Sequence, residues 1–234
     1  ENLVLKGSIY TDYYNFTLRE RGAIGSQATP RYYEAARERS EFNYEALLSY
    51  SKNLGDINVN GLVGTNRADS KYDFLRGQSS GGLVVPGVYN LLNSADPALM
   101  NDLTEEKRVN SVFGQIGFDY LNMFYLEATY RTDWSSALPE ANNQYSYPSV
   151  SGSFVFSELL DADWLSLGKV RLGWAEVGSD TDPYNVFASY DYNTSGSFNA
   201  NPRLLKGDVL YNENLRAETT RSSEYGVDLN FFQN

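Results

Sequence analysis

Four carboxylate residues, Glu127, Asp133, Glu224 and Asp228, are the most obvious candidates for chemistry in this sequence. Glycoside hydrolysis needs two such groups about 5–9.5 Å apart, one of them with a raised pKa. Only the residue type supports that role here. Carboxylates that hydrogen-bond to neighbouring strands explain the same residues more simply, so we expect no catalysis and no catalytic residue.

A second candidate is the acidic segment 179–183, which reads S-D-T-D-P. Carboxylate oxygens are the ligands that Ca²⁺ prefers, but two of them without the spacing of an EF-hand are weak support. Asp is also common in turns, where its side chain caps the backbone. We therefore expect no metal and no cofactor.

A third group consists of aromatic and amide side chains in the segments between the expected strands. Aromatic rings stack on the apolar C–H faces of sugars, and amides bond to hydroxyl groups. Packing between loops, or an aromatic belt at a membrane surface, would explain the same residues. The candidates for substrate binding are Tyr89, Asn90, Tyr145, Tyr147, Tyr184, Tyr190 and Tyr192.

Composition removes several other classes of function. The chain has 234 residues, a net charge of −11, no Cys and no His. The acidic balance argues against nucleic acid, which needs a basic face. The missing residue types exclude thiol catalysis, Ser-His-Asp triads, disulfides and imidazole metal sites. The mean hydropathy is −0.46, but the polar bore of a β-barrel lowers that average.

Alternation with a period of two dominates the sequence. It is clearest from Phe124 to Trp134, where apolar residues at even positions alternate with Glu127, Arg131 and Asp133. Ten steps of roughly 3.3 Å, tilted by about 40°, cover about 25 Å, the height of the apolar band of an outer-membrane barrel. The pattern predicts eight strands, at 3–18, 40–54, 57–69, 108–120, 124–135, 146–157, 169–178 and 220–232.

The connections between these strands are unequal. Those on one side have 21, 38, 10 and 41 residues, and those on the other have 2, 3 and 11. Tight turns on one side and long loops on the other are typical of an outer-membrane barrel. A soluble sheet with one wet face also alternates. The fold expected is all-β, an antiparallel up-and-down transmembrane β-barrel segment with long extracellular loops and short periplasmic turns.

Charged residues obey the same alternation, which predicts the face they share. In a barrel this face would line the lumen, and the apolar face would contact lipid. The lumen-facing residues expected from the alternation are Asp119, Glu127, Arg131, Asp133, Glu224 and Asp228.

Several long motifs resemble one family of membrane proteins. They are E-K-R-V-N-S-V-F-G-Q-I-G-F-D-Y-L-N-M-F-Y-L-E-A-T-Y-R-T-D-W-S-S at 106–136, Y-P-S-V-S-G-S-F-V-F-S-E-L at 147–159, G-G-L-V-V-P-G-V-Y-N-L at 81–91, W-L-S-L-G-K-V-R at 164–171 and N-E-N-L-R-A-E-T-T at 212–220. Together they are similar to the mid-barrel of SusC/RagA-type TonB-dependent transporters of the Bacteroidetes outer membrane. Ala217 departs from the family, in which many members have Pro or Trp.

The resemblance implies a 22-stranded barrel with a plugged lumen. Eight strands cannot close it, so residues 1–234 are expected to be one part of the barrel domain, without the plug domain and the terminal strands. Open sheet edges are not tolerated in lipid. The remaining segments of the same transporter are therefore expected partners, as is outer-membrane lipid. The expected location is the cell outer membrane.

The function implied by the resemblance is import of glycan oligosaccharides, or of peptides in some relatives, energised by TonB acting on the plug. The same resemblance implies a SusD-like surface lipoprotein as a partner, for which the apolar strip at 83–85 is a docking candidate. That strip could instead fold over its own barrel. The alternative function is a secreted or surface-exposed β-rich glycan-binding module using the same tyrosines.

Overall fold

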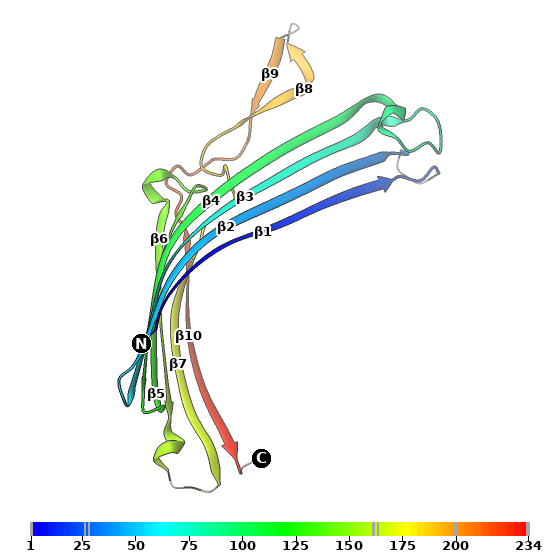
Figure 1. Cartoon of the computed structure of the whole chain (residues 1–234). Helices are drawn as coiled ribbons and strands as arrows, with labels where there is room; N and C mark the ends of the chain where they lie inside the picture. The colour runs from blue at the N-terminus through cyan, green and yellow to red at the C-terminus, as the bar shows by residue number, and fades with distance from the viewer. Residues whose placement is uncertain are drawn as a thin grey trace. The chain divides into compact units, whose positions relative to one another are not determined.

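A computed structural model describes residues 2–25, 27, 29–160, 162, 164–198 and 201–232, with only the backbone for 191–198 and 202. Strands dominate it, with three short 3₁₀ helices (Figure 1). The elements are β1 (Asn2–Arg21), β2 (Tyr32–Asn53), β3 (Ile57–Leu83), η1 (Leu91–Asn93), β4 (Ser94–Tyr120), β5 (Phe124–Ser135), η2 (Glu140–Asn142), β6 (Gln144–Val155), η3 (Phe156–Leu159), β7 (Leu165–Ser179), β8 (Tyr190–Phe198), β9 (Asn201–Lys206) and β10 (Glu218–Phe231).

Eight of the strands form one sheet in the order β1-β2-β3-β4-β5-β6-β7-β10, and β8 pairs with β9 separately. Each strand of the large sheet thus lies beside its neighbour along the chain, apart from the β8–β9 hairpin inserted before β10 (Figure 1). This antiparallel up-and-down sheet confirms the expected fold class. Among the described residues no helix is long and apolar enough to cross a membrane.

Two tight turns occur where the sequence places them. At the β2–β3 turn, Gly55 has φ of 77° and its amide donates to the Asn53 side chain at 3.0 Å. At the β4–β5 turn, Leu121 and Asn122 both have positive φ, and the Asn122 amide donates to Asp119 Oδ1 at 3.0 Å. Two successive residues with positive φ match the right-handed twist of a hairpin.

The connections on the other side are shorter than expected, because β1 to β4 are longer. β3 and β4 have 27 residues each, so most of the segment 70–107, expected as a loop, is strand. A barrel strand needs only about 9–11 residues to cross a membrane. The added parts carry polar residues on both faces, so their hydrophobic alternation is weak although the backbone pairing continues.

The chain divides into two compact units. Unit 1 comprises residues 1–8, 44–67 and 108–234, and unit 2 comprises residues 9–43 and 68–107. In unit 1 the register aligns Phe118 with Leu126, Gly152, Leu172 and Tyr225 on successive strands. Leu126 and Leu172 are 52% and 54% exposed. Nothing in the described part of the chain packs against this apolar face, which a sandwich would bury.

The buried apolar residues are few and mostly small or located near turns. They are Tyr32, Ala35, Met123, Ala137, Leu138, Val155 and Leu165. A soluble β-sandwich owes its stability to a core between two sheets. A sheet whose apolar face has no second layer of protein instead suits lipid.

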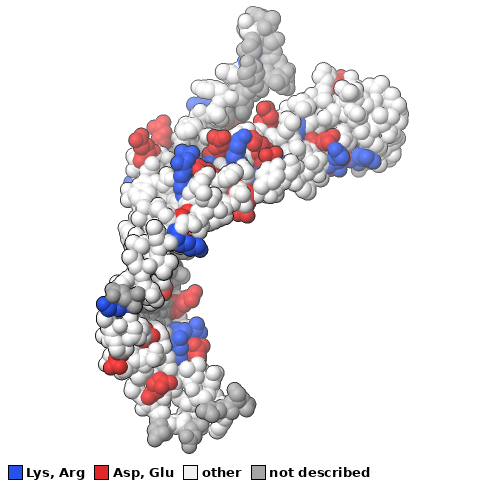
Figure 2. All heavy atoms as spheres, in the orientation of Figure 1, with Lys and Arg blue, Asp and Glu red and all other residues white. Residues whose placement is uncertain are grey.

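Unit 2 has polar side chains on both faces. On one face Arg19 pairs with Glu34 at 2.9 Å, and the Tyr32 hydroxyl donates to the same carboxylate at 2.9 Å. Further along that face the Lys71 ammonium pairs with Asp73 at 2.9 Å. Figure 2 shows basic and acidic side chains interspersed on the visible surface.

Candidate functional site

A hydrogen-bonded cluster of charged side chains lies on the polar face of β4, β5 and β6. The Asp133 side chain is 7% exposed and accepts hydrogen bonds from Arg131 Nε at 2.8 Å and from the Tyr147 hydroxyl at 2.6 Å. Arg131 Nη2 donates to Ser111 Oγ at 2.9 Å. The three strands are therefore joined by side chains as well as by their backbones.

An aromatic ring packs against the arginine of this cluster. The Arg131 guanidinium lies 5.5 Å from the centroid of Phe113. A Cβ placed at Gly64 would come within 2.5 Å of Phe113 and 2.6 Å of Leu47. The missing side chain at Gly64 thus leaves room for the Phe113 ring. It also explains why Leu47 breaks the apolar alternation of its strand, because its side chain packs on the polar face.

The cluster continues towards the segment after β7. The Ser135 hydroxyl donates to the Asp180 carboxylate and accepts from the Ala137 amide at 3.2 Å. Tyr145 stacks on Tyr147 with 6.1 Å between ring centroids. A Cβ at Gly178 would lie 2.5 Å from Tyr145, so the glycine lets the ring lie flat on β7.

This arrangement positions groups and provides no reactive one. Both carboxylate oxygens of Asp133 are engaged within the protein, one by the guanidinium of Arg131 and the other by the Tyr147 phenol. Within the described residues, no group of three or more Asp, Glu, His or Cys side chains could hold a metal ion. Asp180, from the calcium candidate segment, bonds to Ser135 instead.

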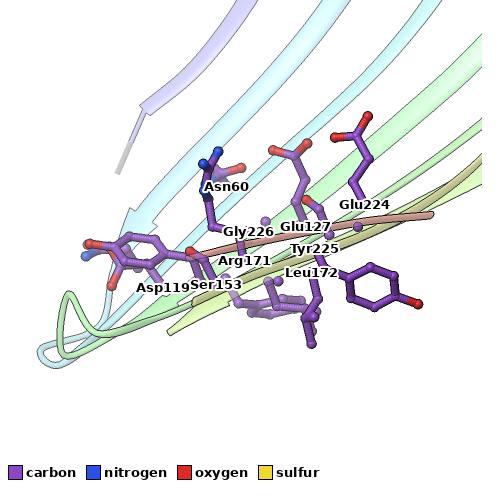
Figure 3. A pocket seen from close by; sticks show the side chains of 17 residues that line it. Asn60, Asp119, Glu127, Ser153, Arg171, Leu172, Glu224, Tyr225 and Gly226 are labelled. Atoms are coloured by element: carbon purple, nitrogen blue, oxygen red, sulfur yellow. The ribbon is translucent and has the colours of Figure 1, made fainter. Parts of the chain in front are cut away.

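A second polar group lines a shallow hollow of about 580 Å³ on unit 1. Its polar side chains are Asn58, Asn60, Asp119, Tyr125, Glu127, Ser151, Ser153, Arg171 and Glu224. Figure 3 shows Asn60, Glu127 and Glu224 pointing to one side of the sheet, and Leu172 and Tyr225 to the other. Three carboxylates and one guanidinium give this surface a net negative charge.

The charged side chains in and beside the hollow differ in how they are held. Arg171 bonds to both carboxylate oxygens of Asp228, at 2.9 and 3.0 Å. Glu127 accepts from Gln115 Nε2 at 2.8 Å. Among the described residues none bonds to the Glu224 carboxylate, which leaves it free for a ligand or another segment. Such groups can bond to the hydroxyls of a sugar or the amides of a peptide.

Two of the loop candidates lie in unit 2 and have local roles. The Tyr89 ring lies 5.5 Å from the Arg21 guanidinium. Asn90 caps η1 by accepting a hydrogen bond from the Leu92 amide at 2.9 Å. Both side chains therefore hold the β3–β4 connection in place.

The remaining tyrosine candidates are dispersed. Tyr184 has φ of 64° and is 47% exposed, and Tyr190 is 62% exposed at the start of β8. Tyr192 pairs with Leu204 through the backbone, and its side chain lies outside the described residues. The structure thus groups Arg131, Asp133, Tyr145 and Tyr147, but it does not bring Tyr184 and Tyr190 into that cluster.

Several residues of these groups were not expected from the sequence. The alternation that places Phe113 on the polar face also places Ser111 there, two residues earlier. Alternation along the preceding strand likewise places Asn58 and Asn60 on one face. Ser135 and Asp180 lie 45 residues apart with no shared strand register, so no periodic signal could have paired them.

Comparison with known proteins gives relatives of one kind. The chain is 25% identical over 232 residues to TonB-dependent receptor P3 of Formosa agariphila, covering 93% of this chain and 22% of the relative. It is 29% identical over 135 residues to TonB-dependent receptor SusC of Bacteroides thetaiotaomicron, covering 52% of this chain and 13% of SusC. No protein-family model matches the sequence.

Solved structures agree in fold. The RagAB peptide transporter superposes with a TM-score of 0.83 at 18% identity, covering 98% of this chain and 26% of that chain. The RagAB peptide importer in its closed-closed state gives a TM-score of 0.82 at 19% identity, covering 99% of this chain and 26% of that chain.

These matches confirm the resemblance found in the sequence: the chain is similar to a segment of SusC/RagA-type TonB-dependent receptors. It spans about a fifth of the length of TonB-dependent receptor P3. TonB-dependent receptors are outer-membrane β-barrel proteins, which agrees with the expected location. The relatives are receptors and transporters rather than enzymes.

Proposed function

We propose that this chain forms part of the barrel wall of an outer-membrane active transporter that imports oligomers, with energy supplied through TonB. The oligomers are glycan oligosaccharides or peptides, taken up together with a SusD-like lipoprotein. The observation that carries the proposal is the two-faced sheet of unit 1, apolar and exposed on one side and charged on the other. Lipid and a watery bore are the two solvents that such a sheet needs.

The rest of the barrel is part of the same proposal. In the described sheet β1 and β10 each have one neighbour, at opposite ends of the strand order. Backbone amides at these edges need partners if they lie in lipid, where each unpaired group costs several kcal/mol, of order 2–7. Further strands of the same transporter would supply them, and a plug domain would lie against the polar face, where the Glu224 carboxylate lacks a described partner.

The test of this function is uptake by living cells. The gene for the full-length protein is deleted and then restored in its own host, and uptake of labelled oligosaccharides and peptides is measured with and without TonB. We expect uptake of one oligomer class to need both proteins. Uptake that continues in cells lacking TonB would contradict active transport.

Contact with substrate is proposed for the polar face of unit 1. Tyr145 and Tyr147 are half-buried, and their stacked rings are held by Asp133 and Gly178. Rigid aromatic side chains bind at a low entropy cost. Glu127 and Glu224 would then bond to polar groups of the oligomer as it passes. Tyr89 and Asn90 are better assigned to the loop that they stabilise.

That loop is the proposed docking point for the lipoprotein. Residues 77–95 contain no charged side chain, and Figure 2 shows an uncharged surface at the tips of β3 and β4. Leu92 is 96% exposed, and Val84 and Val85 are 66% and 51% exposed. Large exposed apolar groups that cluster on a surface indicate an interface.

The loop is built to hold these side chains in place. Asn93 accepts from the Val85 amide at 3.0 Å and donates to the Val85 and Val88 carbonyls at 2.8 and 2.7 Å. The Leu91 side chain packs over Gly77, where a Cβ would lie 2.5 Å from it. A preorganised loop pays less entropy on binding, which supports docking of a protein partner.

A matched pair of substitutions tests the docking. Leu92→Asp in the full-length protein should weaken binding of the purified SusD-like lipoprotein from the same organism by roughly 10–100-fold, since burying a leucine contributes about 1.5–3 kcal/mol. Leu210→Asp is the control, because Leu210 is 92% exposed in the segment between β9 and β10. Equal losses in both variants, measured by surface plasmon resonance, would contradict this docking point.

A further inference from the structure

The register of β1, β2 and β3 in unit 2 assigns side chains to two faces. The Gly22 amide donates to the Arg31 carbonyl, and the Arg19 guanidinium donates to Glu34. Both contacts fit a single antiparallel register between β1 and β2. In that register Phe16 lies opposite Arg37, and Tyr14 opposite Arg39. The Arg37 guanidinium in turn lies 5.3 Å from the Phe74 ring on β3.

The two faces differ in how their charges are compensated. The face of Glu34 carries carboxylate-paired cations, Arg19 with Glu34 and Lys71 with Asp73. Side chains alternate along a strand, so Arg37, three residues after Glu34, points to the opposite face, as do Arg39 and Arg76. This opposite face carries the Arg–aromatic patch, which comprises Tyr14, Phe16, Arg37, Arg39, Phe74 and Arg76.

The three guanidinium groups of the patch lack carboxylate partners. Among the described residues no carboxylate forms an ion pair with Arg37, Arg39 or Arg76, and all three are exposed. On the same face Glu41 accepts from Asn43 Nδ2 at 2.9 Å. By register Asp12 lies opposite Glu41, and Glu105 of β4 lies opposite Tyr72, next to the Asp73–Thr104 pair.

Three arginines without a bonded carboxylate among the described residues lie close together on this face, although the chain has a net charge of −11 and Asp12, Glu41 and Glu105 share the face. Residues two apart on a strand are roughly 6.6–6.8 Å apart, and neighbouring strands about 4.8 Å apart. Like charges at such distances repel each other. An anionic ligand would reduce that repulsion, whereas on the paired face Arg19 and Lys71 bond to carboxylates and Arg21 lies against the Tyr89 ring.

Two of the three aromatic members of the patch are exposed. Tyr14 and Phe16 are 49% and 50% exposed on β1. Flat rings presented beside guanidinium groups can take the C–H face of a sugar while Arg forms two parallel bonds to a carboxylate or sulfate. Phe74 is already covered by Arg37, which it orients.

We propose that the Arg–aromatic patch is a binding subsite for acidic oligosaccharides. Their carboxylate or sulfate groups pair with Arg37, Arg39 and Arg76, and a sugar ring stacks on Tyr14 or Phe16. An open sheet face with rings side by side suits a chain of sugar rings better than an extended peptide, which uses backbone bonds at a sheet edge. The subsite rests on the proposed function only in that it names the class of oligomer imported.

The test is calorimetric titration of the full-length protein in detergent with four probes. These are tetragalacturonate, a sulfated carrageenan tetrasaccharide, maltotetraose and a tetraglutamate peptide. We expect one or both acidic sugars to bind, more weakly as salt is added. Their affinity should fall by roughly 10–100-fold in R37Q/R39Q, since bonds to charged groups contribute about 1.5–3 kcal/mol.

The control variant R19Q/K71Q removes the same charge from the paired face and should bind the acidic sugars as the wild type does. R37K/R39K, which keeps the charge but loses the planar fork, should lie between the wild type and R37Q/R39Q. If R37Q/R39Q fails to reach the outer membrane, the single variant R76Q replaces it, with an expected loss of at least several-fold.

Four results would overturn the subsite: no binding of either acidic sugar, equal binding of maltotetraose, tighter binding of tetraglutamate, or equal losses in R37Q/R39Q and R19Q/K71Q. Sulfated and carboxylated probes are compared directly, so the experiment identifies which group is preferred. Titration needs no TonB. A protein that binds acidic sugars but shows no TonB-dependent uptake would therefore contradict the proposed function and leave the subsite intact.

Discussion

Units 1 and 2 use the same antiparallel backbone but distribute their side chains differently. In unit 1 exposed apolar residues such as Leu126 and Leu172 occupy one face, and charged residues such as Glu127 occupy the other. In unit 2 both faces carry charge, with Glu34 on one and Arg37 on the other. This difference is expected if unit 1 contacts lipid on one face and water on the other, and unit 2 contacts water on both faces.

The comparison also separates two ways of using charge. Asp133 in unit 1 is nearly buried and compensated by Arg131 and Tyr147, so it fixes the positions of neighbouring side chains. Arg37 and Arg39 in unit 2 are exposed without a described carboxylate partner, so they remain available to a ligand. Asp133 therefore has a structural role, and Arg37 and Arg39 are the residues that we propose for binding.

The strongest test of the comparison is a charge on the apolar face of unit 1. Leu126→Arg should prevent assembly in the outer membrane, because an arginine facing lipid at the middle of a barrel strand costs about 2–4 kcal/mol. Ser151→Arg is the control, since Ser151 lines the polar hollow beside Glu127. The amount of heat-modifiable protein in purified outer membranes reports the result. Normal assembly of the Leu126→Arg variant would mean that this face does not meet lipid.

The same contrast explains what could be predicted from the sequence. The strand at 124–135 was predicted with its observed bounds, because apolar and polar side chains alternate strictly along it. The strand expected at 57–69 runs instead to Leu83. Beyond residue 69 both faces are polar, so the hydrophobic period disappears while the backbone hydrogen bonds continue. The β8–β9 hairpin was missed because its polar sequence is typical of a loop.

The candidate site divides in a similar way. Alternation along β5 is enough to place Arg131 and Asp133 on the same face. Tyr147 lies on the neighbouring strand, β6, and its side chain points to that face. Register is needed to pair Asp133 with Tyr147, and a tertiary contact is needed to bring Asp180 to Ser135. Alternation specifies a face but does not specify distances along it, so the hydrogen-bond partners could not be predicted.

A second test compares two carboxylates of unit 1 that differ in burial. Asp133→Asn should lower the free energy of unfolding by about 2 kcal/mol, because the side chain at this nearly buried position loses the charge that pairs with Arg131. Asp228→Asn removes a similar bond from a carboxylate that is 39% exposed, and should cost about 0–1 kcal/mol. Urea unfolding in detergent measures both values. Equal effects would show that burial does not distinguish them.

A third test concerns the space that Gly64 leaves for the Phe113 ring. Gly64→Ala should destabilise unit 1 by about 1 kcal/mol, because the new methyl group overlaps Phe113 and Leu47 and both side chains must shift. Gly61→Ala is matched to it on the same strand, where the nearest atom to a new Cβ is the Gln115 carbonyl oxygen at 3.7 Å. The same unfolding experiment compares the two, and a larger loss in Gly61→Ala would refute the packing argument.

The smallest effect is expected in unit 2, at Glu34 of β2. Hydrogen bonds from the Tyr32 hydroxyl and the Arg19 guanidinium lower the pKa of Glu34. A carboxyl group whose pKa is lowered in the folded state stabilises it above the unfolded pKa, which is about 4.3, and loses that contribution as the pH falls through the folded pKa.

Glu34→Gln should therefore speed hydrogen exchange in β1 and β2 of unit 2 slightly at pH 7, and the difference from the wild type should vanish at acidic pH, below the lowered pKa of Glu34. In an Arg19→Gln background the effect of Glu34→Gln should shrink, because one of its two donors is already gone. An effect that grows as the pH falls would reverse the sign of this linkage.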